Sequence, residues 1–204
     1  MSKGRTMTKN ALGGSMVAFA LACAPAAYAH PGHAAGVGLA AGFAHPFLGL
    51  DHLLAMVAVG LWAAQLEGRV RFAVPAMFVT AMAVGAATAV GGIAPPAVEL
   101  GIAVSVLVLG LLIAARARLE LGASLMLIAA FAVLHGHAHG ADLAQSASPL
   151  LFGTGMLLAT AALHAIGFAA GTACRAARNE ARLRATGAAI ALTGALFWAL
   201  PALV

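Results

Sequence analysis

The segment from His45 to His52 combines residue types that bind transition metals with a carboxylate inside a long apolar stretch. Asp51 is the only acid that we place away from the ends of a predicted membrane span, where a charged side chain costs about 2.5–3.5 kcal/mol to insert. Such a cost predicts a functional role or a dedicated partner for the carboxylate. Met56 follows His52 by four residues, so both side chains lie on one side of a helix. Imidazole and carboxylate together suit a borderline divalent ion, and methionine adds a soft donor.

The spacing of these residues leaves two interpretations open. If one helix begins near Pro46, His52 lies about 10 Å from His45 along the axis, too far for both to hold one ion directly. Asp51 lies about 100° around that helix from His52, where it either supplies charge or orients a neighbouring group. The alternative is a buried Asp–His pair that only locks the helices together.

A second segment, from His135 to Asp142, contains three histidines separated by small residues. If it is helical, His135, His139 and Asp142 share one face, because they are spaced at i, i+4 and i+7. Its glycines would otherwise unwind it and expose carbonyls, as transporters do at ion sites. A histidine-rich tract is a metal-binding signal. The alternative is a flexible polar loop with weakly binding histidines.

Three further positions complete the set of histidines. His164 stands alone in an apolar run, on one helical face with Met156 and Thr160, and it belongs either to an ion path or to ordinary packing. His30 and His33, together with His137 of the second segment, are candidates for capturing metal outside the membrane. The alternative is that His30 and His33 are ordinary polar residues left at the N-terminus after the signal peptide is removed.

The elements that must position these donors are membrane helices. Of the 204 residues, 63% are hydrophobic and 8% are charged, and the mean hydropathy is +0.99. A soluble domain needs a charged exterior that this chain cannot supply. Its apolar stretches are continuous rather than alternating, which favours helices over a barrel. We therefore expect an all-α integral membrane protein, a six-helix transmembrane bundle after a cleavable signal peptide.

The N-terminal segment is typical of a signal peptide. A basic stretch up to Lys9 precedes an apolar run, and Ala27-Tyr28-Ala29 offers a cleavage site. We expect residues 1–29 to be removed and residues 30–204 to form one transmembrane domain; the alternative is an uncleaved first helix. A short helix at 35–44 precedes the predicted spans, which cover about 46–66, 72–91, 97–114, 119–134, 149–172 and 186–203.

The distribution of basic residues predicts the orientation. All 11 lysines and arginines lie either in the N-terminal segment or after the first, third and fifth spans, and the loops at 92–96 and 140–149 contain none. The positive-inside rule then places those three connections in the cytoplasm, with both mature ends in the periplasm. A nucleic acid partner is excluded because the basic clusters are short and have no aromatic residues interleaved for stacking.

Several segments resemble the HupE/UreJ family of nickel permeases, and the resemblance covers nearly the whole mature chain. The first span matches most specifically, and the family has Glu where this chain has Asp142, one methylene shorter. The matching motifs are His45-Pro46 through Asp51-His52 and on to Trp62, His135-Gly136-x-Ala138-His139-Gly140, and Leu158-Ala159-Thr160-Ala161-x-Leu163-His164-x-x-Gly167.

The resemblance implies secondary or facilitated import of nickel, or else cobalt, across the bacterial inner membrane to supply enzymes such as hydrogenase or urease. The expected partners are the divalent ion and the lipid bilayer, with no permanently bound cofactor. An enzyme is not expected, because no H-E-x-x-H helix occurs, and the lack of a Gly-Lys pair excludes a P-loop. The alternative function is a membrane-embedded metal sensor or metalloenzyme-assembly protein.

Overall fold

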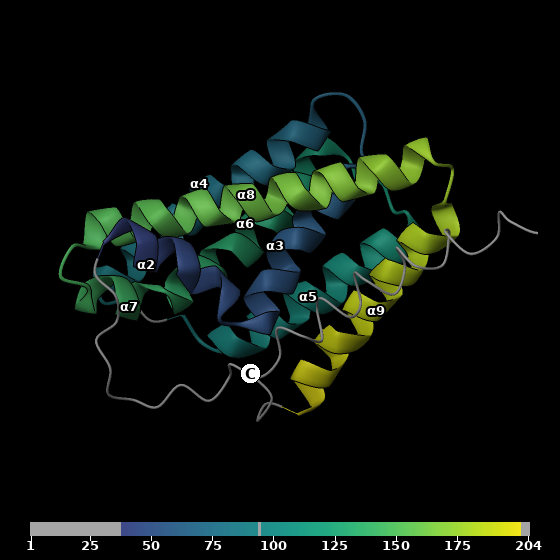
Figure 1. Ribbon diagram of the computed structural model, residues 1–204. Coiled ribbons are helices and arrows are strands. Elements are labelled where there is room, and N and C mark those ends of the chain that lie inside the picture. Colours follow the sequence, from purple (N-terminus) through teal and green to yellow (C-terminus); the bar gives the residue numbers. More distant parts are fainter. Residues whose placement is uncertain (1–37, 94, 201–204) are drawn as a thin grey trace, which may run out of the picture. The chain divides into compact units, whose positions relative to one another are not determined.

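The computed structural model describes residues 38–93 and 95–200. All secondary structure in this part of the chain is helical (Figure 1). The predicted signal peptide lies outside the described residues. The elements are α2 (Leu39–Ala44), η2 (His45–Phe47), α3 (Leu50–Ala63), α4 (Val70–Val90), α5 (Val98–Ala115), α6 (Leu121–Ala138), α7 (Gly140–Gln145), α8 (Pro149–Ala176) and α9 (Glu180–Ala199).

Membrane-spanning length and hydropathy are found in four stretches of the described chain: α4, α5, α6 with α7, and α8. A fifth span results if α2 with η2 and α3 are taken as one bent unit. These helices make the chain a multi-pass membrane protein. The predicted sixth span is a helix, α9, but it does not meet the same measure. Its first turns carry Glu180, Arg182 and Arg184, which lower its hydropathy.

The first predicted span is not one continuous helix. The chain bends by 87° between Phe47 and Leu50, so the prediction of a helix running on from Pro46 is wrong. Pro46 lies inside the short 3-10 helix η2, and Gly49 has an extended backbone with φ −106° and ψ 121°. A Cβ at Gly49 would lie 2.8 Å from Oδ1 of Asp51 and 3.1 Å from Nδ1 of His52. Glycine at this bend therefore lets the two side chains fold back over the backbone.

Helices pair closely where small residues face a neighbouring backbone. The main pairs are α5 with α9, α4 with α6, and α3 with α8. A Cβ added at Gly136 of α6 would lie 1.9 Å from the carbonyl oxygen of Met82 in α4. One added at Gly60 of α3 would lie 2.1 Å from the carbonyl oxygen of His164 in α8. At these glycines the backbones of the two paired helices touch directly, as in other membrane bundles.

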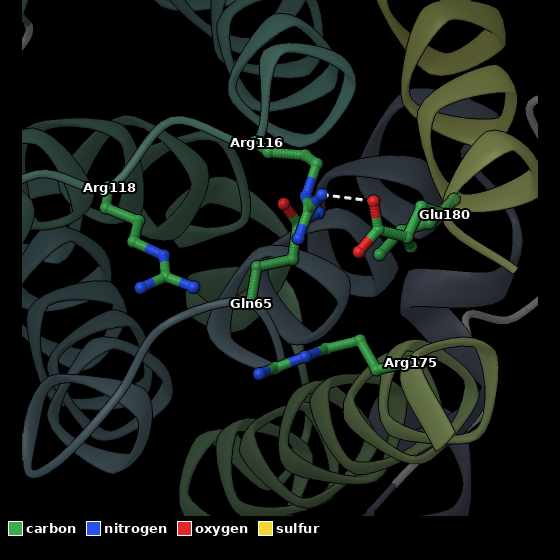
Figure 2. A pocket seen from close by; sticks show the side chains of 6 residues that line it. Gln65, Arg116, Arg118, Arg175 and Glu180 are labelled. Atoms are coloured by element: carbon green, nitrogen blue, oxygen red, sulfur yellow. Dashed lines mark hydrogen bonds and ion pairs between the residues drawn. The ribbon is translucent and has the colours of Figure 1, made fainter. Parts of the chain in front are cut away.

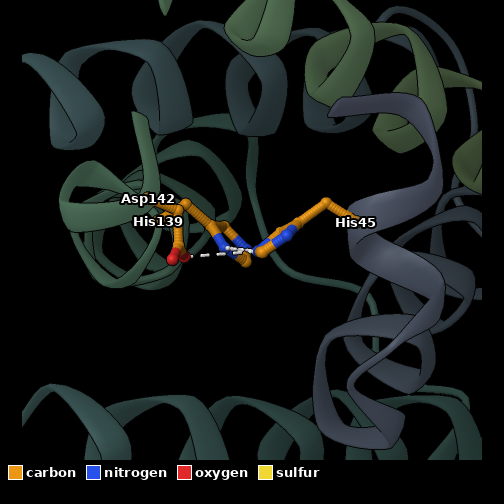
Figure 3. A group of neighbouring side chains, drawn as sticks. All are labelled: His45, His139 and Asp142. Carbon is orange, nitrogen blue, oxygen red and sulfur yellow. Dashed lines mark hydrogen bonds and ion pairs between the residues drawn. The ribbon is translucent and has the colours of Figure 1, made fainter. Parts of the chain in front are cut away.

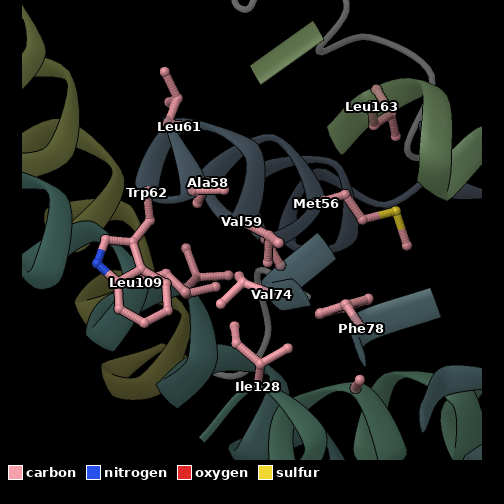
Figure 4. Packing of buried hydrophobic residues seen from close by; sticks show 14 of the residues in the cluster. Met56, Ala58, Val59, Leu61, Trp62, Val74, Phe78, Leu109, Ile128 and Leu163 are labelled. Carbon is pink, nitrogen blue, oxygen red and sulfur yellow. The ribbon is translucent and has the colours of Figure 1, made fainter. Parts of the chain in front are cut away.

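The buried core lies around α3. Trp62, Met56 and Phe78 are among its largest fully buried side chains, and Figure 4 shows them packed with Val59, Val74, Leu109 and Ile128. The indole of Trp62 donates a hydrogen bond of 2.9 Å to the carbonyl oxygen of Ala117. Large apolar side chains are also exposed, including Leu150 at 82%, as expected where lipid is the solvent.

The arginine-bearing connections lie together. Figure 2 shows Arg116, Arg118 and Arg175 around Gln65, with Glu180 paired to Arg116. Arg175 also donates a hydrogen bond to the carbonyl oxygen of Ala64 at the end of α3. The connections that follow α3, α5 and α8 thus meet on one side of the bundle, as the predicted topology requires.

Candidate metal centre

Three side chains from distant parts of the chain meet beside the bend. Nε2 of His45 lies 3.0 Å from Nδ1 of His139 and 3.4 Å from Oδ2 of Asp142. One donor atom from each residue lies within 4.8 Å of the other two, and Figure 3 shows the side chains converging from η2 and from the α6–α7 junction. His139 is 5% exposed, whereas the Asp142 side chain is 50% exposed. The group therefore connects the surface with the interior.

The His-rich segment forms this group because it is helical almost throughout. Helix α6 continues to Ala138, and α7 begins at Gly140, where a loop was predicted. A Cβ at Gly140 would lie 2.0 Å from Cβ of Ala89, so the junction packs tightly against α4. His139 at the junction and Asp142 in the first turn of α7 are thereby turned toward His45.

The carboxylate of Asp51 is hydrogen-bonded to the next residue, His52. Its Oδ1 accepts hydrogen bonds of 2.8 Å from both the backbone N–H and the ring Nδ1 of His52. This pairing fixes the tautomer of His52 and leaves Nε2 with a lone pair, the arrangement seen in metal-ligating histidines. Nε2 of His52 is buried and has no hydrogen-bond partner among the described residues. Asp51 is therefore placed to orient a ligand and to contribute negative charge.

Four imidazole rings form a row from His45 inward. Ring centroids are 4.7 Å apart for His45 and His139, 4.5 Å for His139 and His52, and 5.2 Å for His52 and His135. Nδ1 of His135 donates a hydrogen bond of 2.9 Å to the carbonyl oxygen of Phe131, so its lone pair is on Nε2. The Nε2 atoms of His139 and His135 are also buried without partners in the described chain. The row thus offers consecutive nitrogen donors.

The row continues past Phe78 to His164. The Phe78 ring centroid lies 5.5 Å from that of His135 and 5.1 Å from that of His164. Both ring nitrogens of His164 are buried without a hydrogen-bond partner in the described part of the chain. Met56 of α3 contacts α8 one turn before His164, with its Sδ 3.4 Å from Oγ1 of Thr160.

The remaining candidates do not join the row. His30 and His33 lie outside the described residues. His137 is directed toward α4 instead, with its Nδ1 3.5 Å from Oγ1 of Thr88. Of the second segment, only His135, His139 and Asp142 face the other donors.

Sequence reasoning missed three residues that shape this region: Gly49, Phe78 and Met82. Gly49 allows the bend, Phe78 lies between two histidines, and Met82 contacts Thr160. Phe78 and Met82 are four residues apart in α4, which is apolar from Phe72 onward except for two threonines. A phenylalanine and a methionine in such a helix give no signal that separates them from lipid-facing neighbours.

Comparison with known proteins identifies the family. Residues 17–197 match the family described as HupE / UreJ protein. The chain is 41% identical over 177 residues to Protein HupE of Rhizobium leguminosarum bv. viciae, which covers 86% of this chain and 92% of that protein. No solved structure matches. With a family match over most of its length and a close relative of nearly equal span, this chain belongs to the HupE/UreJ family.

Proposed function

We propose that the protein imports a divalent transition-metal ion, nickel in the first place and cobalt in the second, across the inner membrane. The imported ion would supply metalloenzyme maturation, such as that of hydrogenase or urease. The observation that carries the proposal is the convergence of His45, His139 and Asp142 at the outer end of the histidine row. Family membership supports the same function.

The donor set favours nickel or cobalt over harder ions. One carboxylate with two imidazoles suits borderline divalent ions, whereas magnesium and calcium prefer oxygen ligands throughout. In this structure His45 and His139 share a hydrogen bond, so one nitrogen carries a proton between them. A bound ion replaces that proton, because each ligating nitrogen must present a lone pair.

The arrangement favours passage over storage. Asp142 and His45 are partly exposed, His139 is buried, and His52 and His135 follow at short ring distances. An ion can therefore exchange ligands one at a time. A storage or catalytic site would instead hold all its donors around one position, and catalysis would also need an activated water beside a substrate cleft. The protein is accordingly proposed to be a permease with no permanently bound cofactor.

The membrane potential is a sufficient energy source. A divalent cation that enters a negative interior gains about 4.6 kcal/mol per 100 mV, at about 2.3 kcal/mol per charge. At equilibrium this free energy supports an ion concentration inside the cell about three orders of magnitude above that outside. In the proposed orientation, the arginine-bearing connections lie in the cytoplasm and the mature termini in the periplasm. The potential then drives the ion from the periplasm to the cytoplasm.

The test is accumulation of radiolabelled nickel in cells with and without the chain, with cobalt and zinc as competitors. His45→Ala and His139→Ala should each abolish most accumulation. His137→Ala is the matched control, because His137 lies in the same segment but is directed toward Thr88. Nickel binding by the purified protein without any cellular accumulation would instead support a metal sensor or an assembly protein.

A further inference from the structure

We propose that the bundle contains a second cation site, deeper than the first, in which the thioethers of Met56 and Met82 and the imidazoles of His135 and His164 are the donors. The second site rests on the proposed import, because it receives the same ion at a later stage of passage. It differs from the first site in having sulfur donors and no carboxylate.

The two thioethers meet at Thr160. Oγ1 of Thr160 lies 3.4 Å from Sδ of Met56 and 3.6 Å from Sδ of Met82. A hydroxyl has one proton to donate, and the carbonyl oxygen of Met156, 2.9 Å away, is the stronger acceptor. Both sulfur atoms therefore keep their lone pairs, and one polar atom fixes their positions. In Figure 4, Met56 points away from the Trp62 side of α3.

The two imidazoles have nitrogen atoms without partners. His135 is fully buried and His164 is 3% exposed. Nε2 of His135 and both ring nitrogens of His164 make no hydrogen bond to any described residue. Burying a polar group without a partner costs about 1–3 kcal/mol by mutational data. A buried polar atom of this kind requires an explanation, and coordination of an ion supplies one for both side chains.

Backbone contacts bring the four donors to one level of the bundle. Gly136, next to His135, packs against the carbonyl oxygen of Met82. The carbonyl oxygen of His164 packs against Gly60, one turn beyond Met56 on α3. Phe78 contacts the rings of both His135 and His164, and it precedes Met82 by one turn on α4. The segments of α3, α4, α6 and α8 that carry the four donors thus pack against one another.

His164 lies beside a space between two helices. It lines a cavity of about 300 Å³ between α4 and α8, together with Pro75, Val79 and Phe168. At His135, Nδ1 is held by the carbonyl oxygen of Phe131.

The chemistry of this site suits an ion in transit. Thioethers and neutral imidazoles are soft or borderline donors, which favour nickel, cobalt and copper over magnesium and calcium. The donors carry no net charge, so the site attracts the ion less strongly than the carboxylate-containing outer site. An ion that has lost its hydration shell can therefore stop there and still leave toward the cytoplasm.

The experiment is nickel X-ray absorption on the full chain in lipid nanodiscs, with Cys23→Ser and Cys174→Ser as background so that methionine is the only sulfur source. We expect sulfur bonded directly to nickel, and two nickel ions per chain in equilibrium dialysis. The double variant Met56→Leu, Met82→Leu should lose the sulfur signal and bind one ion. The control Met126→Leu, in which the altered side chain is 76% exposed on α6, should retain both.

The outcomes separate this site from the proposed function. If cells accumulate nickel but the wild-type spectrum shows no bonded sulfur, the deep site is overturned and import stands. If sulfur is bonded but cells do not accumulate nickel, import fails and the residues form a binding site only. Two bound ions with an unchanged sulfur signal in the double variant would also refute the assignment.

Discussion

The Nε2 atom of His45 lies 3.0 Å from Nδ1 of His139, across 94 residues of sequence. Asp142 approaches the same His45 nitrogen from the first turn of α7. These contacts join two of the three motifs by which the chain resembles its family into one centre. They also indicate what metal binding must change, since the proton shared by the two rings has to leave.

Asp51→Asn should lower nickel uptake about 10- to 100-fold, the usual effect of losing a group that orients a metal ligand. An amide at this position can present its N–H₂ group to Nδ1 of His52 and so select the wrong tautomer. Uptake should be measured at equal membrane abundance, with Asp51→Glu as the charge-conserving comparison. Normal transport by the Asn variant would show that the pair is only structural.

Asp142→Glu should keep most of the nickel uptake, whereas Asp142→Ala should raise the nickel concentration needed for half-maximal uptake. The carboxylate is half exposed, so a longer side chain has room to keep its oxygen near His45. Initial rates over a range of nickel concentrations measure both effects. An Ala variant with an unchanged concentration dependence would exclude Asp142 from the centre.

Uptake should fall as the external pH is lowered from neutrality, because imidazole must be neutral to bind metal. Protons then compete with the ion at His45, His139 and the rings behind them. Initial rates should be taken at fixed membrane potential and fixed free nickel. A clear rise in rate toward acid would contradict ligand competition and support proton coupling.

Reporter fusions should decide the topology, and in particular whether α9 spans the membrane. We expect reporters near residues 69 and 180 to be cytoplasmic and those near 94 and 145 to be periplasmic. A fusion after residue 200 should be periplasmic if α9 crosses the bilayer. A cytoplasmic signal there would reduce the bundle to five spans, and one at 94 or 145 would overturn the orientation.

Gly136→Ala should destabilise the protein by about 1–3 kcal/mol, the usual cost of overpacking, because the new Cβ would meet the carbonyl oxygen of Met82. Gly122→Ala is the matched control in the same helix, since nothing lies within 4 Å of its Cβ position. There the substitution should be neutral or stabilising, as alanine favours helices. Thermal unfolding in detergent compares the two variants; equal shifts would contradict the close α4–α6 contact.

The structure alters how the first motif is understood. A straight helix separates His45 from His52 by more than a single ion can bridge, yet both rings contact His139. The reason is the bend at Gly49, which turns α3 away from η2 and lets Asp51 fold onto His52. Residue spacing along one helix could not show this, because it assumes that the helix is continuous.

The sequence by itself determined the helical membrane architecture, the candidate orientation and the identity of the donor residues. Lipid leaves no other way to satisfy the backbone of long apolar segments, and a carboxylate or histidine among them is conspicuous. Tertiary structure alone decided which donors meet. The helices are apolar on all sides, so their sequences do not encode a preferred face. The pairing depends on local fits such as Gly136 against Met82, which also bring Met82 to Thr160.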